Sequence, residues 1–238
     1  MKKFELTTDF TINFLGKKLF RIKALVDIER YGVKAGDLGG YVEKESNLSQ
    51  EGDAWVYGDA KVYGDAWVCG DAWVYGDAWV YGNAEVYGNA KVCGDAWVYG
   101  NAKVYGNAEV YGNAEVYGDA KVYGDAWVYG DAWVYGNAKV CGDAWVYGNA
   151  KVYGNAEVYG DAWVYGDADY TTIKGFGTVQ RTTTFFKCKD NIVRVVCGCF
   201  YGTIEEFREQ VKKTRAGKIA TEYLLIADLM ELHFKEAE

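Results

Sequence analysis

The pattern of apolar and polar positions repeats every six residues through the middle of the chain. From Gly52 to Asp169 every sixth residue is glycine, and twenty consecutive hexads follow the form G-[D/N]-A-x-V-Y without an insertion. In an extended strand, side chains alternate between two faces, so alanine and valine share one face while the variable residue x and tyrosine share the other. Glycine followed by Asp or Asn fits a sharp corner, because these residues tolerate the left-handed backbone conformation. Each hexad is therefore predicted to form one side of a coil with alanine and valine inside.

Hexads with one small and one branched inward residue resemble the left-handed parallel β-helix, in which three hexads form a triangular coil. Twenty hexads then predict about 6.7 coils and, at a strand spacing of about 4.8 Å, a rod roughly 32 Å long. A right-handed solenoid is the alternative. In either case the interior holds no ionisable group, and stability is a sum of contacts between neighbouring coils.

The flanking segments are predicted to cap this rod, so that the fold is mainly β with three parts at 1–51, 52–169 and 170–238. Residues 3–28 alternate like a hairpin that turns at 15–18. The N-terminal cap is thus β-rich, and it ends in an irregular first coil whose expected inward residues are Val42, Leu48 and Val56.

The C-terminal cap is predicted to be a small α+β unit. Residues 182–187 and 192–196 read as a hairpin, and Thr203 with Glu206 forms a capping box that opens a helix. Gly217 separates this helix from a second one at 218–234, whose buried face is expected to hold Ile219, Tyr223, Ile226 and Met230. Solenoids need covered ends to avoid polymerisation through open strand edges, so capping is the expected role of both flanks.

Three hexads per coil sort the variable position into three rows, because residues eighteen apart then stack. The first row is Trp55, Trp73, Lys91, Glu109, Trp127, Trp145, Trp163. The second row is Lys61, Trp79, Trp97, Glu115, Trp133, Lys151, Asp169. The third row is Trp67, Glu85, Lys103, Lys121, Lys139, Glu157.

All nine tryptophans are therefore expected to point outward, and the first two rows are mostly aromatic. Monomers rarely expose contiguous apolar patches beyond a few hundred Å², so one interpretation is a docking surface for another copy, a protein partner or a ligand that stacks on rings. The other interpretation is that the rings stack on one another and stiffen the coils. The candidate binding surface is formed by the tryptophans of the first two rows: Trp55, Trp73, Trp127, Trp145, Trp163, Trp79, Trp97 and Trp133.

Charge and cysteine usage narrow the possible partners. The formal net charge is −8, and the repeat alone holds 6 Lys against 13 Asp and 4 Glu. This sign disfavours nucleic-acid binding, while a DNA mimic is an alternative in spite of a charge density about half that of duplex DNA.

The six cysteines do not fit a disulfide framework, which favours a cytoplasmic protein, and Cys197-Gly198-Cys199 is a weak metal signal. No stretch is long and apolar enough for a membrane helix, and the start of the chain lacks a signal peptide's apolar region.

The run KAGDLGGYVE at 34–43, followed by Asn47-Leu48-Ser49 and the first G-D-A-W-V, closely resembles the YdcK-like hexapeptide-repeat proteins of bacteria and their phages. The C-terminal CGCF and the helix with Glu206-Phe207 look like the tail of phage-encoded members. Such relatives are often classed as transferases, because hexapeptide β-helices also build acyltransferases. The resemblance implies a fold more than an activity.

An acyltransferase of this kind would resemble its relatives in carrying a histidine base on the solenoid. The single histidine, His233, lies outside the repeat, and no nucleophile with a paired base or phosphate-binding loop is present in the sequence. We therefore expect a non-enzymatic structural or protein-interaction solenoid that self-associates and uses no metal or cofactor. The alternatives are carbohydrate or nucleotide binding by ring stacking, an acyltransferase and the acidic DNA mimic.

Overall fold

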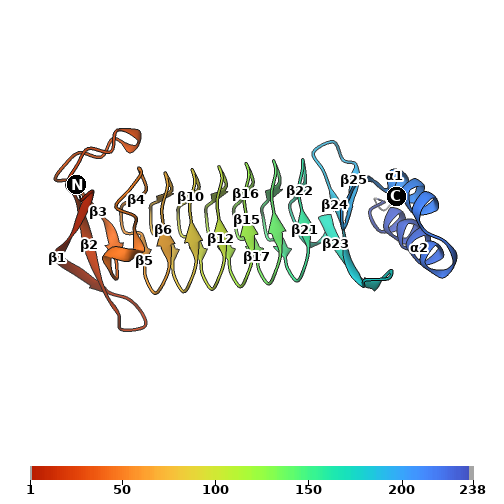
Figure 1. Ribbon diagram of the computed structural model, residues 1–238, viewed down its shortest axis with the longest axis horizontal. Helices are drawn as coiled ribbons and strands as arrows, with labels where there is room; N and C mark the ends of the chain where they lie inside the picture. Colours follow the sequence, from red (N-terminus) through yellow and green to blue (C-terminus); the bar gives the residue numbers. More distant parts are fainter. Residues whose placement is uncertain (1, 236–238) are drawn as a thin grey trace.

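The computed structural model describes residues 2–235 and shows a straight β-solenoid with one cap at each end (Figure 1). Nineteen of the twenty predicted hexads contribute one two-residue strand each, formed by the variable residue and the following valine. The twentieth does not, because Asp169 is followed by Tyr170 and lies in a 3₁₀ turn. The first-row strands are β4 (Trp55–Val56), β7 (Trp73–Val74), β10 (Lys91–Val92), β13 (Glu109–Val110), β16 (Trp127–Val128), β19 (Trp145–Val146) and β22 (Trp163–Val164).

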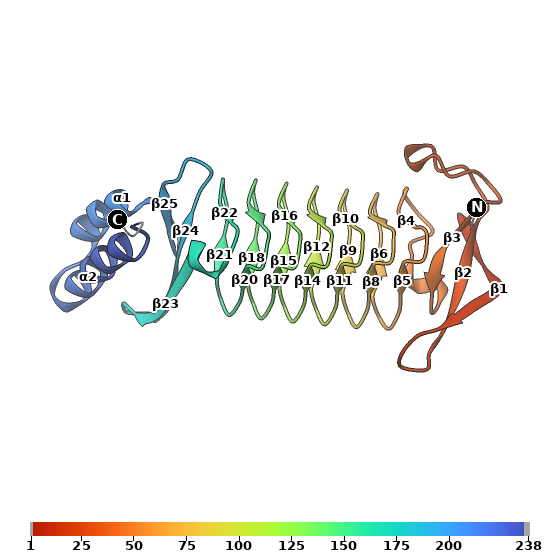
Figure 2. The same cartoon turned by 180° about the vertical axis from the view of Figure 1, so that it is seen from behind.

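The other two rows form their own sheets, and in the view from behind the second-row strands lie in one file (Figure 2). The second-row strands are β5 (Lys61–Val62), β8 (Trp79–Val80), β11 (Trp97–Val98), β14 (Glu115–Val116), β17 (Trp133–Val134) and β20 (Lys151–Val152). The third-row strands are β6 (Trp67–Val68), β9 (Glu85–Val86), β12 (Lys103–Val104), β15 (Lys121–Val122), β18 (Lys139–Val140) and β21 (Glu157–Val158).

The pairing register confirms the three rows. Each strand pairs in parallel with the strand eighteen residues later, as Lys103 does with Lys121 and Val104 with Val122. Backbone amides join the coils, for example Lys103 N–H to the carbonyl of Ala120 at 2.9 Å. The inward alanines and valines from Ala54 to Val164 are fully buried, so the interior is the predicted stack of small and branched side chains.

The corners explain why glycine recurs without exception. Corner glycines from Gly52 to Gly160 have φ between +64° and +75°, where a side chain would strain the backbone. They also stack closely: a Cβ placed on Gly124 would lie 2.9 Å from the backbone nitrogen of Gly142 in the next coil. The neighbouring amides are joined along the rod, since Asn83 Nδ2 donates to Asn101 Oδ1, and Asn101 Nδ2 donates to Asp119 Oδ1, both at 2.9 Å.

The N-terminal cap extends the second-row sheet. Strands β1 (Phe4–Ile12) and β2 (Lys18–Ala24) form the expected antiparallel hairpin, and β3 (Leu38–Val42) pairs antiparallel with β2 and parallel with β5. Two 3₁₀ turns, Glu29–Tyr31 and Glu45–Asn47, complete the cap. The irregular first coil is confirmed, because the buried side chains of Val42, Leu48 and Val56 lie in register with Val62, Val68 and Val74.

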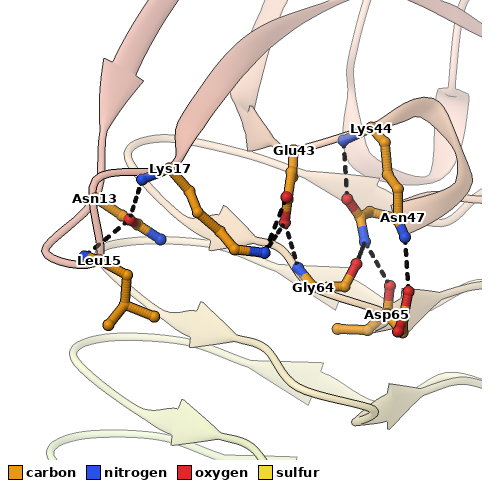
Figure 3. Close-up of polar contacts among 9 residues, drawn as sticks. Asn13, Leu15, Lys17, Glu43, Lys44, Asn47, Gly64 and Asp65 are labelled. Atoms are coloured by element: carbon orange, nitrogen blue, oxygen red, sulfur yellow. Dashed lines mark hydrogen bonds and ion pairs between the residues drawn. The ribbon is translucent and has the colours of Figure 1, made fainter.

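A buried amide ties this coil to the first regular corner (Figure 3). Asn47 is fully buried; its Nδ2 donates to the carbonyls of Gly64 at 3.1 Å and Ala66 at 2.8 Å, while its Oδ1 accepts from the Lys44 N–H. Lys44 Nζ also pairs with Asp65 at 2.7 Å. The polar groups that the irregular coil would leave unpaired are thus satisfied by the regular one.

The hairpin turn is anchored to the same corner (Figure 3). Asn13 Oδ1 accepts from the backbone N–H groups of Leu15 and Lys17, which fixes the turn. Lys17 Nζ then pairs with Glu43 at 2.9 Å, and Glu43 accepts the N–H of Gly64 at 2.7 Å. The turn therefore leans toward the second-row face of the solenoid.

The C-terminal cap is a four-stranded antiparallel sheet followed by two helices. A 3₁₀ turn at Asp167–Asp169 ends the repeat, and the sheet order is β23 (Tyr170–Phe176), β24 (Arg181–Lys187), β25 (Val193–Cys197) and β26 (Phe200–Thr203). The β24–β25 hairpin confirms the sequence prediction. Strands β23 and β26 were not predicted, since neither segment shows a clear alternation of apolar and polar residues.

The helices are α1 (Ile204–Thr214) and α2 (Gly217–His233), and the Thr203–Glu206 capping box is present. Phe186 and Val196 of the sheet join the solenoid core, whereas Phe185 and Val195 pack against the helices. The sheet thereby closes the end of the rod and separates it from a second small core. No helix among residues 2–235 has the length and apolarity to span a membrane.

Candidate functional site

The outward aromatic residues form ladders along the rod. In the tyrosine ladder beside the second row, successive ring centroids from Tyr63 to Tyr135 are 4.9–5.0 Å apart, with planes within 6° of parallel. Trp127 and Trp145 stack at 5.1 Å with planes 2° apart. This spacing follows from the coil repeat, because parallel strands lie about 4.8 Å apart. Most ring faces are therefore covered by neighbouring rings, and the ring edges face outward.

A tyrosine of one coil meets the tryptophan of the next coil edge to face. Tyr111 lies 6.2 Å from Trp127, and Tyr129 lies 6.4 Å from Trp145, with planes 76° apart in both pairs. Edge-to-face pairs contribute about 0.5–1.5 kcal/mol beyond the area they bury. The rows thus contribute to the stability of the rod, as the second sequence interpretation expects.

Burial also affects the ionisation of the ladder tyrosines. Burial raises the pKa of Tyr81 to about 12, and Tyr159 shows the same direction and value. A raised folded-state pKa means that the unfolded chain releases its phenolic protons first as the pH rises. The stabilising contribution is complete below pH 10 and is lost as the pH rises through 12.

We therefore expect the solenoid to lose stability steeply above pH 10. Exposed tyrosines such as Tyr165 can ionise in the folded protein, but the last part of the tyrosinate absorbance, from the buried ladder, should appear together with the loss of circular dichroism. The Tyr81→Phe variant should show a weaker loss of stability with pH. Complete ionisation of the tyrosines near pH 10 while the dichroism of the fold stays unchanged would contradict this expectation.

The structure corrects the expected exposure of Trp55. Its side chain points out of the coil but is fully buried, because the N-terminal cap covers it: the ring of Phe4 lies edge-on at 6.5 Å, and Gly39 passes directly over the indole. Its Nε1 has no hydrogen-bond partner among the described residues. Trp55 therefore belongs to the core and not to a binding surface.

The cap also covers the neighbouring tryptophans. Tyr31 stacks on Trp73 at 4.6 Å, and Phe14 from the hairpin turn stacks on Trp79 at 5.2 Å and lies 6.4 Å from Trp97. Sequence reasoning missed both Phe14 and Tyr31. A turn that places Phe14 next to Leu15, two large apolar residues beside Gly16, was a signal that the turn packs against another surface.

The C-terminal half of the first row lies outside this covered region. Trp127 and Trp145 are half-buried in their ladder, and Trp163, 39% exposed, meets Trp145 edge-on at 6.2 Å. The ammonium of Lys189 lies 4.5 Å from the centre of the Trp145 ring. On the second row, Lys151 covers Trp133 in the same way at 4.9 Å.

Charged residues at the variable position pair along their rows. Lys103 pairs with Glu85 and Lys139 with Glu157, each at 2.8 Å, on the third row. The third row also holds Trp67, which is 46% exposed and which the candidate surface left out. The third face is thus mainly a charged surface with one exposed tryptophan at its N-terminal end.

Cys69, Cys93 and Cys141 take the tyrosine position of their hexads, whereas the other three cysteines and the histidine lie in the C-terminal cap. All six cysteines are free, and among residues 2–235 no group of three or more His, Cys, Asp or Glu side chains is placed to hold a metal ion. Cys188 is buried at the solenoid end, whereas Cys197 and Cys199 flank the turn between β25 and β26. His233 ends α2, with its ring edge-on to Phe234.

Comparison with known proteins agrees with this architecture. The family model of the YdcK β-solenoid repeat matches residues 150–166, which include strands β20, β21 and β22 and so span about one coil. No curated protein matches the chain. Because the matched coil has the same hexad pattern and parallel pairing as the other coils, the chain is a β-solenoid repeat protein of the YdcK type.

Proposed function

We propose that the protein is a non-enzymatic interaction rod that self-associates through the C-terminal half of the first row. The observation that supports this is the ladder of Trp127 and Trp145, continued by Trp163, on which no aromatic ring from the described part of either cap stacks as Tyr31 does on Trp73. The C-terminal cap contacts this ladder through Lys189, whose ammonium lies over Trp145. We call these three tryptophans the open ladder. Aromatic residues at the centre of a patch with a polar rim are typical of protein interfaces.

Ring geometry favours a protein surface over a stacking ligand at this site. A sugar or nucleobase stacks on a free ring face and needs about 3.5 Å on each side, and rings about 5 Å apart leave no room for one between them. In the open ladder the faces of Trp145 are covered by Trp127 and by Lys189. The exposed ring edges form ridges separated by grooves. The ridges of a second surface can fit into these grooves.

Charge around the open ladder predicts how its association depends on salt. The corner residues Asp143 and Asp161 are exposed beside it, and the whole repeat is acidic. Two copies that meet through this face repel each other electrostatically, so added salt should strengthen their association. Binding to a basic partner would weaken with salt instead.

We expect the double variant Trp127→Ser/Trp145→Ser to be monomeric under conditions in which the wild type associates. The patch is small, so the interface falls in the weak class below about 1,200 Å², and the measurement needs protein on the order of 100 μM. Sedimentation equilibrium at low and high salt gives both the mass and its salt dependence.

The matched control is Trp67→Ser, which removes an exposed indole from the third row. It should associate as the wild type does, because that row lies on another sheet. A wild type that stays monomeric at every salt concentration, or a double variant with an unchanged mass, would contradict self-association through this ladder.

A further inference from the structure

A cleft in the C-terminal cap lies outside the aromatic rows and has a different chemistry. It has a volume of about 390 Å³ and lies between the β23–β24 turn, the β25–β26 turn and the two helices. Phe200, Phe207 and Val211 contribute apolar walls, and Arg181 and Arg215 line the same space. No Asp or Glu is among the residues that line it.

The two arginines are unusual for this acidic protein. The other arginines of the C-terminal cap form ion pairs, Arg194 with Asp190 at 2.6 Å and Arg208 with Asp228 at 2.9 Å. Within residues 2–235, neither Arg181 nor Arg215 has a carboxylate partner; the guanidinium of Arg215 donates only to the adjacent Thr214 carbonyl. Two guanidinium groups thus bring positive charge to a cleft whose lining residues include no carboxylate.

The position of Arg181 depends on a glycine. Gly198 has φ +65°, and a Cβ placed on it would lie 1.8 Å from Arg181 Nη1. The guanidinium therefore rests on the turn between Cys197 and Cys199, where a side chain at position 198 would displace it. The C-G-C sequence, a weak metal signal by itself, has a specific structural role in this arrangement.

Polar groups in the floor of the cleft are already engaged. Thr183 Oγ1 donates to Cys197 Sγ at 3.3 Å, and Tyr223 Oη donates to the carbonyl of Phe176 at 3.3 Å. Arg181, Arg215 and Tyr223 all line this cleft. Burial raises the pKa of Tyr223, and the two arginines oppose this shift, in keeping with their place in the same cleft.

We propose that this cleft binds a small organic anion, with its oxyanion between Arg181 and Arg215 and its apolar part against Phe200 and Phe207. Guanidinium groups bind phosphate, sulfonate and carboxylate groups through paired N–H donors, which the unpaired forks here can supply. The volume accommodates one or two rings rather than a polymer. This binding is independent of the aromatic ladders.

The test uses 1-naphthyl phosphate as the probe and uncharged 1-naphthol as its control, with binding measured by calorimetry. The phosphate should bind at least about tenfold more tightly than naphthol, and the Arg181→Gln/Arg215→Gln variant should lose that difference. Lys174→Gln removes one positive charge from the exposed surface of the same cap and should bind as the wild type does. Melting curves show that each variant is folded.

A second readout uses Cys199, which is exposed at the cleft. The rate of alkylation by anionic iodoacetate, divided by the rate with neutral iodoacetamide, reports the local potential. This ratio should be several-fold higher at Cys199 than at Cys69 in the acidic repeat, and should fall in the double arginine variant. Equal binding of phosphate and naphthol, or a ratio that does not change in a folded double variant, would overturn the proposal.

Discussion

The Val122→Asp variant should unfold the middle of the rod, with a loss of about 4 kcal/mol or more in the free energy of unfolding. Val122 is fully buried among the inward valines, and its neighbours in the stack are Val104 and Val140. The introduced carboxyl would have no polar partner, and burying an unpaired charge is among the most destabilising changes known. Urea denaturation followed by tryptophan fluorescence measures the loss.

The residue before it in β15 offers a matched control. Lys121 is exposed and lies between Lys103 and Lys139 on the third row, so Lys121→Asp places a carboxyl in water beside two ammonium groups. Its effect should stay within about 0.5 kcal/mol. The deficit of Val122→Asp should also shrink as the pH falls, because burial favours the neutral carboxyl. Equal stability of the two variants would contradict the inward placement of Val122.

The second large effect is expected at Trp55. The Trp55→Ala variant should lose about 3–5 kcal/mol, because the substitution empties the space beneath Phe4 and Gly39. Loss of the N-terminal cap should follow, since Trp55 is the largest fully buried side chain at the junction of cap and solenoid. Hydrogen exchange in β1 to β3, measured by mass spectrometry, should increase before exchange in the central coils.

Two variants make this result interpretable. Trp67→Ala removes the same residue type at the same repeat position from a side chain that is 46% exposed, and should cost less than about 1 kcal/mol. Trp55→Phe keeps an aromatic ring and removes the unpaired indole N–H, so it should cost less than Trp55→Ala. Similar losses in the free energy of unfolding for Trp55→Ala and Trp67→Ala would contradict the burial of Trp55 beneath the cap.

The solenoid itself could be predicted from the sequence because each of its features is local. The hexad fixes the corner, the inward pair and the outward pair, and the eighteen-residue stacking follows from three sides per coil. The rows built from residues such as Lys103 and Lys121 therefore agree with the observed register. The inward residues of the first coil, Val42 and Leu48, could be found because they are six residues apart, as in the repeat, although each pairs with a residue twenty positions later and not eighteen.

The contacts that cover the aromatic rows could not be predicted from the hexad pattern. Trp55 and Trp67 lie in the same run G-D-A-W-V, and the path of the N-terminal cap buries the first and leaves the second exposed. The contact of Phe14 with Trp79 likewise joins segments 65 positions apart through a turn whose direction depends on Glu43 and Gly64. The placement of Arg181 and Arg215 in one cleft has the same origin, since it depends on how the helices fold back on the sheet.

The gapless hexad sets an angular relation between the two ends of the molecule. Each hexad adds one of the three sides of a coil, so inserting or deleting one would turn everything that follows by about a third of a revolution. The C-terminal cap and its cleft would then face a different direction relative to the N-terminal hairpin. Only changes of eighteen residues would alter the length while keeping both ends in phase, so the number of hexads specifies an orientation as well as a distance.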